Sequence, residues 1–340
     1  MKKLFIDPIT RLEGHGRILL LLDDEGKLED AFLQIPELKG FELFCRGRRG
    51  EEMPQITERI CGVCPEAHHL ASAKCLDACF GAEVPPAARV QRELFYNVYI
   101  FSDHLLHLIF LGGPDLLLGA DAEKAKRNIL GILEAYPEFG KKVVRVRAGA
   151  QKILELIGGK AIHPVFALPG GVAKPLAEDD RAFVEERAAA MVELAGDLVE
   201  LFHKRILPDP SFQSFLLAEE LNFPTHYMGL VDGDLAPNFY DGALRIVSAE
   251  GKEIYHGPAP DALSLIGEHV ESWTYVKFPY LKEYGWKGLV PGPDSGIYRV
   301  GPLARLNVAE RMATPMAQEE YERYLDFFGG KPVHSTFAYH

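Results

Sequence analysis

Residues 59–72 read Arg-Ile-Cys-Gly-Val-Cys-Pro-Glu-Ala-His-His-Leu-Ala-Ser and hold two cysteines three positions apart. A Cys-x-x-Cys turn brings both sulfurs to one side, where they can bind one soft or borderline metal such as zinc, iron, nickel or copper. Pro65 suits the first turn of a helix, and His68 then lies one turn beyond Cys64. His68 could therefore be a metal ligand, a hydrogen-bond partner of the Cys64 sulfur, or a core histidine.

The cysteine pair alone is compatible with several classes of site. A thioredoxin-like redox site would follow a strand in a βαβ unit, and the sequence predicts no such strand here. A structural zinc site would need a second pair of ligands, which Cys75 and Cys79 could supply from one face of a predicted helix. Two cysteines in that position are more often small buried hydrophobic residues.

A second group of charged residues precedes the first predicted strand. Residues 7–16 read Asp-Pro-Ile-Thr-Arg-Leu-Glu-Gly-His-Gly, so Arg11, Glu13 and His15 alternate and would point to one side of an extended chain. This pattern is also typical of a solvated turn. A carboxylate such as that of Glu13 could carry protons to and from a buried site if burial raised its pKa.

Hydrophobic periodicity predicts a mainly α protein with small β elements, in the α+β class. Proline and glycine residues set the ends of several predicted helices. Two hairpins are expected near residues 4–35 and 243–255, and residues 256–300 read as an irregular, aromatic-rich segment. Because no linker or repeat interrupts the chain, residues 1–340 are predicted to form a single domain. The predicted helices span residues 65–80, 87–111, 141–157, 179–207 and 314–328.

Composition narrows the functional class. The 340 residues carry a formal net charge of -12, which argues against nucleic acid as a partner. The apolar start at residues 1–6 is too short for a secretory signal, and no apolar run approaches the roughly 20 residues that span a bilayer. We therefore expect a cytoplasmic protein without a membrane span. Five cysteines, all between residues 45 and 79, indicate metal binding more than a disulfide framework.

Taken together, the motifs resemble those of the nickel–iron hydrogenase large subunit. The cysteine signature follows Ile-Thr-Arg-Leu-Glu-Gly-His at residues 9–15, and residues 158–171 hold Gly-Gly-Lys-x-x-His-Pro and then Leu-Pro-Gly-Gly. Residues 272–281 and 298–307 are also similar to the branch of this family that couples hydrogen to soluble carriers. Five such segments in order cover most of the chain.

The resemblance implies roles for the residues at matching positions. Cys61 would be a terminal thiolate on nickel, and Cys64 would bridge nickel to an iron that also carries diatomic ligands. His68 would hydrogen-bond near the bridging sulfur, and Glu13 would relay protons. Glu42 falls where the family has a carboxylate for a separate Mg²⁺ or Fe²⁺ ion.

The family also has a second Cys-x-x-Cys in an Asp-Pro-Cys-x-x-Cys-x-x-His tail, which this sequence does not contain. Two of the four thiolates are therefore expected from a segment outside this sequence or from another chain. The chain given is expected to be inactive by itself.

The implied reaction is the reversible heterolytic cleavage of H₂ into protons and electrons. Because the five cysteines cannot also bind iron–sulfur clusters, the resemblance implies a small subunit that carries the clusters. Further subunits linked to flavin and NAD(P), deazaflavin or ferredoxin would accept the electrons. A metal-free relative of the quinone-site subunit of complex I and an unrelated helical protein with a structural zinc site are the alternatives.

Overall fold

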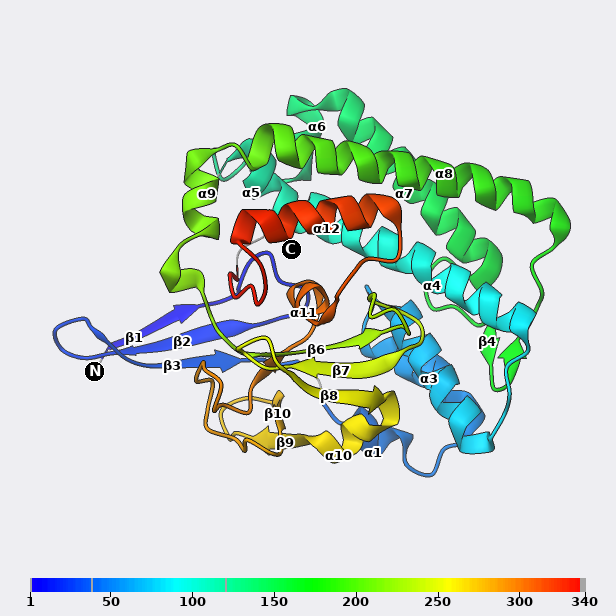
Figure 1. Ribbon diagram of the computed structural model, residues 1–340, viewed down its shortest axis with the longest axis horizontal. Coiled ribbons are helices and arrows are strands. Elements are labelled where there is room, and N and C mark those ends of the chain that lie inside the picture. Colours follow the sequence, from blue (N-terminus) through cyan, green and yellow to red (C-terminus); the bar gives the residue numbers. More distant parts are fainter. Residues whose placement is uncertain (1, 38, 120, 337–340) are drawn as a thin grey trace. The chain divides into compact units, whose positions relative to one another are not determined.

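The computed structural model describes residues 2–37, 39–119 and 121–336, and its contacts divide the chain into two compact units. The first unit combines Met1–Leu38 with Pro208–His340, and the second is the continuous segment Lys39–Leu207. The mainly helical α+β class predicted from the sequence is confirmed (Figure 1). The single-domain organisation stays a prediction, and the last four residues, where the sequence stops, lie outside the described residues.

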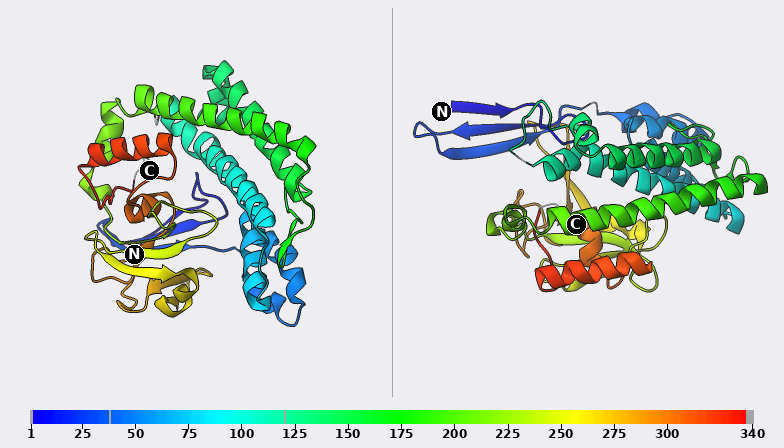
Figure 2. Two further views of the ribbon diagram at one scale, coloured as in Figure 1. Left: turned by 45° about the vertical axis from the view of Figure 1, so that its right-hand side comes forward. Right: turned by 90° about the horizontal axis from the view of Figure 1, so that it is seen from above.

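The second unit is helical. Its long helices α4, α7 and α8 pack side by side in that order, as the cyan and green ribbons of Figure 2 show. Its α-helices and strands are α1 (Phe41–Cys45), α2 (Met53–Thr57), α3 (Pro65–Phe80), α4 (Pro86–Leu106), α5 (Gly113–Leu118), α6 (Ile129–Ala135), α7 (Pro137–Gly158), β4 (Ala167–Leu168), β5 (Gly171–Val172) and α8 (Glu178–Leu201).

The predicted end of the second helix at Gly112–Gly113 is wrong. The helix instead passes through a π-helical turn, His107–Gly112, and continues as α5 to Leu118. A Cβ atom on Gly113 would lie 2.6 Å from the Leu108 carbonyl oxygen, so the glycine permits the close approach in this turn. The glycine pair here shapes a bulge within a helix rather than a C-terminal cap.

This continuous helical stretch also bears on the predicted lack of a membrane span. Residues Pro86–Leu118 form a helix long and apolar enough to cross a bilayer by length and composition. The prediction that no segment reaches that length is therefore wrong for the folded chain. The core helix of a soluble protein passes the same test, and a single such helix is weak evidence for a span.

Among its described residues, the first unit contains three sheets. The antiparallel sheet β1–β2–β3 includes the predicted hairpin and one further strand, β1, which pairs with β2 from Lys2↔Leu22 to Ile6↔Ile18. A second sheet has the order β11-β6-β7-β8, and β9 pairs with β10. The elements are β1 (Lys2–Ile6), β2 (Arg17–Leu22), β3 (Leu28–Gln34), α9 (Pro210–Leu216), β6 (His226–Val231), β7 (Ala243–Val247), β8 (Glu253–Pro258), α10 (Ala262–Leu265), β9 (Ile266–Val270), β10 (Lys277–Leu281), β11 (Tyr298–Arg299), α11 (Pro302–Val308) and α12 (Pro315–Phe328).

Strand β6 is buried on both faces because its side chains alternate between two clusters. Tyr227 and Val231 pack with α11 and α12, whereas Met228 packs with Leu281 on the other face. The predicted irregular segment 256–300 instead contains the β9–β10 hairpin. Its aromatic residues do pack together: Trp273 and Phe278 have ring centroids 5.7 Å apart.

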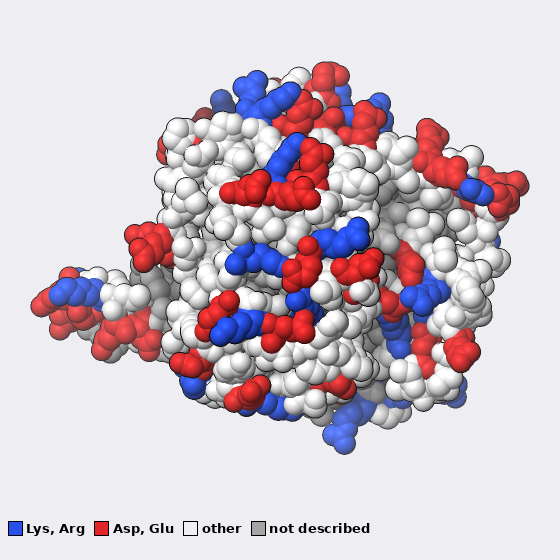
Figure 3. All heavy atoms as spheres, viewed as in Figure 1, with Lys and Arg blue, Asp and Glu red and all other residues white. Residues whose placement is uncertain are grey.

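Charges are spread over the face in Figure 3, with Lys and Arg interspersed among Asp and Glu. Acidic residues gather at the tip of the β1–β2–β3 sheet, where Asp23 accepts backbone hydrogen bonds from Glu25 and Lys27.

Candidate metal centre

The Cys-x-x-Cys motif forms a short turn between two helical segments of the second unit. Cys61 follows a 3₁₀ turn, Glu58–Ile60, and Cys64 is the residue that precedes α3. Pro65 occupies the first helical position, where its missing N–H leaves no helix hydrogen bond unmade. The backbone N–H of Cys64 donates to Cys61 Sγ at 3.2 Å. This hydrogen bond orients the Cys61 sulfur within the turn.

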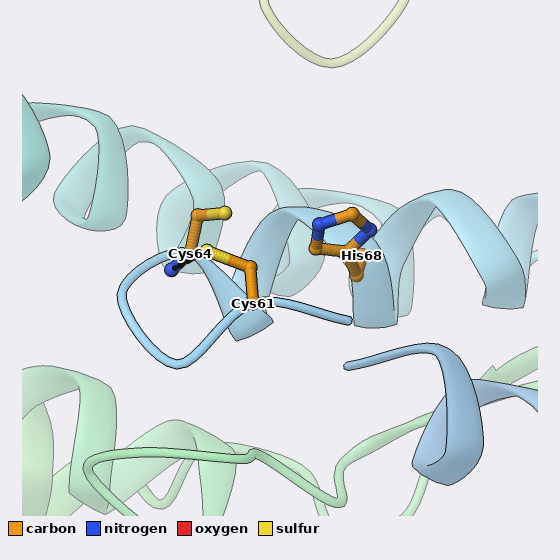
Figure 4. Close-up of side chains that lie close together, drawn as sticks. All are labelled: Cys61, Cys64 and His68. Atoms are coloured by element: carbon orange, nitrogen blue, oxygen red, sulfur yellow. Dashed lines mark hydrogen bonds between the residues drawn. The ribbon is translucent and has the colours of Figure 1, made fainter. Parts of the chain in front are cut away.

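Three potential metal ligands meet at this turn. The sulfur atoms of Cys61 and Cys64 and a ring nitrogen of His68 all lie within 4.8 Å of one another. Figure 4 shows the two thiols on the loop and the imidazole on the adjoining turn of α3. Burial lowers the pKa of His68, which favours the neutral ring. All three side chains are partly buried, and no other such group of three occurs among the residues that the structure describes.

This donor set fits the nickel–iron centre that the resemblance implies. Thiolates are the ligands that soft and borderline metals prefer, and partial burial leaves one side of the group open to further ligands. A closed four-cysteine zinc site does not fit. Cys75 and Cys79 lie about 16 and 22 Å farther along α3, at 1.5 Å per residue, and face solvent.

His69 holds the start of α3 in place, a role that the sequence did not predict. Its Nε2 accepts the Ala167 N–H at 3.1 Å, so in the neutral ring Nδ1 carries the proton and faces the Pro54 carbonyl at 3.3 Å. The side chain is only 1% exposed, and burial lowers the pKa of His69. Because the ring is neutral, the Glu58 carboxylate 3.7 Å from Nδ1 is a polar contact rather than an ion pair.

A buried ion pair fixes the C-terminal part of α3. Arg92 on α4 is fully buried and donates to Asp77 at 2.6 Å, while Asp77 also accepts the Gly170 N–H at 2.7 Å. The same guanidinium donates to the carbonyl oxygens of Leu168 and Gly171. These hydrogen bonds connect α3, which carries His68, to α4 and to the β4–β5 hairpin.

Glu13 lies in the first unit, in a turn closed by its own hydrogen bonds. The Ile9 N–H donates to the Gly16 carbonyl at 2.9 Å, and His15 Nε2 lies 2.9 Å from Asp7 Oδ1. The Glu13 side chain is exposed. The alternating arrangement expected for an extended strand is wrong here, because Arg11 has a φ of 62° and the chain bends.

Glu42 is an exposed residue in the first turn of α1 in the second unit. The structure thus brings together Cys61, Cys64 and His68, and in the described residues neither glutamate belongs to that group of donors. The doubled histidine at residues 68–69 was the one sequence signal that pointed to His69.

Comparison with known proteins identifies the family. A "Nickel-dependent hydrogenase" family model matches residues 39–134, and a "HoxL-like" model matches residues 3–38. An F420-non-reducing hydrogenase iron-sulfur subunit from Archaeoglobus profundus is 42% identical over 100% of this chain and 70% of its own length. The NAD-reducing hydrogenase HoxS subunit beta of Cupriavidus necator is 36% identical over 98% of this chain and 69% of its own length.

Solved structures agree with this result. An NAD⁺-reducing [NiFe]-hydrogenase in the H₂-reduced state superposes with a TM-score of 0.90 at 37% identity, covering 99% of this chain and 72% of the other. A Ni-Fe-Se hydrogenase from D. vulgaris Hildenborough, at 24% identity and a TM-score of 0.70, shares the fold. The chain belongs to the nickel-dependent hydrogenase family, as the large, catalytic subunit of a nickel–iron hydrogenase, an oxidoreductase that acts on H₂.

Proposed function

We propose that Cys61 and Cys64 are two of the thiolate ligands of the hydrogen-cleaving nickel–iron centre, and that His68 supports them. The observation that carries this proposal is the group of two sulfurs and one imidazole within 4.8 Å of one another. By the resemblance, the sulfurs of Cys61 and Cys64 would both hold this centre. The remaining thiolates would come from residues outside this sequence, in the same chain or in another.

When bound, the nickel–iron centre supplies the Lewis-acid and redox chemistry for splitting H₂. The residues of this chain handle the proton. When it holds the metal, the sulfur of Cys61 would be a thiolate that could take the proton in transit. The Cys64 N–H at 3.2 Å fixes the direction of that sulfur's lone pairs. His68 would donate a hydrogen bond to the sulfur of Cys64, since a ring nitrogen of His68 and both sulfurs lie within 4.8 Å of one another.

Glu13 is proposed to pass the proton on towards solvent. A carboxylate suits this role because it can accept and release a proton at moderate pH. The hydrogen-bonded turn at residues 7–16 presents Glu13 at the surface of its unit. Glu42 is proposed as a ligand of a separate Mg²⁺ or Fe²⁺ ion, for which an oxygen donor on an exposed helix turn is suitable.

Electrons are proposed to leave through a small subunit that contains iron–sulfur clusters. Relatives of this chain are named as subunits of multi-subunit hydrogenases, one of them NAD-reducing and another F420-non-reducing. We infer that further subunits pass the electrons to a soluble carrier through flavin and NAD(P), deazaflavin or ferredoxin. A cytoplasmic location follows from such a carrier.

The metal assignment is tested with Cys64→Ala, using Cys75→Ala as a matched control on the same helix. The assay measures bound nickel and iron by elemental analysis and H₂ oxidation with an artificial dye in the assembled enzyme. We expect Cys64→Ala to lose both metals and turnover, and Cys75→Ala to retain them. Nickel and turnover retained in Cys64→Ala would remove the assignment.

The relay assignment is tested with Glu13→Gln, which keeps the size of the side chain and removes its proton chemistry. We expect isotope exchange between D₂ and water to slow at least tenfold while the nickel content stays the same. Loss of nickel in this variant would show a structural role for Glu13 and contradict the relay. The paired controls are Glu25→Gln, at the tip of the β2–β3 turn, and the unaltered enzyme.

A further inference from the structure

Cys75 and Cys79 form a cluster of thiols that the hydrogenase assignment does not use. Both are exposed thiols, and they lie one turn apart on α3. Residues four apart on a helix have Cβ atoms about 5–6 Å apart on one face, and the Cys79 side chain is near enough to Cys75 to raise the pKa of the Cys75 thiol. The exposed neighbours Ala71 and Ala78 have small side chains that leave the face accessible.

The position of this pair separates it from the proposed metal centre. Cys75 lies 11 residues beyond Cys64, which corresponds to about 16 Å along the helix. The inward side of the same helix turn is occupied by Asp77, which binds Arg92 and the Gly170 N–H. The two thiols therefore face outward from a segment of α3 that a buried ion pair holds rigidly.

We propose that Cys75 and Cys79 form a two-thiol site for one thiophilic metalloid or soft d¹⁰ metal ion. Only two sulfurs converge, and in the described part of the chain no histidine or carboxylate completes a group of three with them. Such a site suits ions that accept two thiolates, such as trivalent arsenic, and not ions that require four ligands. A direct disulfide fits less well, because disulfides need Cβ atoms roughly 3.5–4.5 Å apart.

The surroundings of Cys75 favour the protonated form of its thiol. The pair lies near the carboxyl end of α3, where unsatisfied carbonyl groups disfavour negative charge. Burial and the neighbouring Cys79 sulfur raise the pKa of Cys75. Reagents that require a thiolate, such as iodoacetamide, should therefore react slowly. A trivalent arsenical that accepts two thiols at once should bind readily.

Phenylarsine oxide is the probe. Two As–S bonds form, the As=O bond and both S–H bonds break, and the oxygen leaves as water with no change in oxidation state. Because the second thiol reacts intramolecularly, loss of either cysteine should weaken binding by about 10²-fold or more. The adduct should be reversed by a dithiol such as dimercaptopropanol and resist a monothiol at the same concentration.

The probe is added to the assembled, nickel-loaded enzyme, in which the proposed ligands Cys61 and Cys64 would be bound to metal. The same labelling is then repeated with the Cys61→Ser/Cys64→Ser variant. Intact mass spectrometry counts phenylarsenic groups, and peptide mapping locates them. We expect one group per chain on the peptide with Cys75 and Cys79. The group should be retained in Cys45→Ser and lost in Cys75→Ser and in Cys79→Ser.

Three outcomes would overturn the proposal. One is an adduct that persists in both single variants, and another is a group mapped to Cys45. The third is two separate single-thiol adducts on Cys75 and Cys79. H₂ turnover of the loaded enzyme should be unchanged by the probe, which distinguishes this site from the proposed centre. Inhibition by the probe that persists in Cys75→Ser would place the reagent at Cys61 and Cys64.

Discussion

The two hydrogen bonds of His69 should stabilise the protein and fix the position of the first turns of α3. His69→Phe keeps an aromatic ring of similar size and removes both polar atoms. The Ala167 N–H and the Pro54 carbonyl, both in buried residues, would then lose their partner. Leaving a buried polar group unsatisfied costs about 1–3 kcal/mol, so losing both partners should lower the free energy of unfolding by roughly 2–6 kcal/mol.

Two conservative variants separate the bonds. The carbonyl oxygen of the glutamine in His69→Gln can accept the Ala167 N–H, and the amide nitrogen in His69→Asn can donate to the Pro54 carbonyl. Each should lose about 1–3 kcal/mol, less than His69→Phe. His104→Phe is the control, because His104 is exposed and its Nδ1 lies 2.9 Å from the carbonyl oxygen of Ile100 in its own helix. We expect the free energy of unfolding to change by less than about 0.5 kcal/mol.

Urea denaturation measures the free energy of unfolding, and the absorption spectrum of bound Co²⁺ reports the geometry of the thiols. We expect the cobalt–thiolate band to weaken or shift in His69→Phe and to recover in His69→Gln. A general loss of packing would lower stability equally in all three variants. A value for His69→Phe within about 0.5 kcal/mol of the unaltered chain, or an unchanged cobalt spectrum, would refute the reasoning.

Two further predictions concern buried polar groups away from the thiols. Arg92→Met should lower the free energy of unfolding by about 3–5 kcal/mol, because it leaves the Asp77 carboxylate and two carbonyl groups without the guanidinium. Urea denaturation measures this change. The double variant Arg92→Met/Asp77→Leu should recover part of the lost free energy of unfolding. A loss in the double variant equal to or larger than that in Arg92→Met would contradict the ion-pair explanation. Tyr321 should make the stability of the protein sensitive to alkali. Burial raises the pKa of the Tyr321 hydroxyl to about 12 from an ordinary 10. Its contribution to the free energy of unfolding is therefore complete below pH 10, and about 3 kcal/mol is lost as the pH rises to 12. Stability measured between pH 9 and 12 should fall less steeply in Tyr321→Phe, and identical slopes would show that another group is responsible.

Local signals accounted for much of the helical structure. The helix from Pro65 to Phe80 and the last helix were predicted to within a residue, since Gly81 and Gly329 adopt the left-handed conformation that ends a helix. The two expected hairpins were also found. The Cys61–Cys64–His68 group was predicted because all three residues lie within eight positions of sequence.

Features that depend on distant residues were not predicted. Strand β1 is recognisable only through its pairing with β2, because Lys2–Ile6 is too short to show a period of its own. The partner of His69 is Ala167, 98 positions away, and periodicity carries no information on such a contact. Likewise, Arg92 reads as a surface cation on an amphipathic helix, whereas its carboxylate and carbonyl partners bury it completely.

The division of the chain also has a consequence for its biosynthesis. The unit with the thiols is a continuous segment, Lys39–Leu207, whereas the other unit requires residues on both sides of it. At ribosomal speeds of about 5–20 residues per second, synthesis of Lys39–Leu207 takes roughly 10–30 s. Strands β1, β2 and β3 therefore leave the ribosome that long before the later part of their own unit. Only then can the Tyr275 N–H reach the carbonyl of Ile35. A nascent chain would therefore present a complete cysteine turn to any metal-delivering factor while its first strands still await their partners.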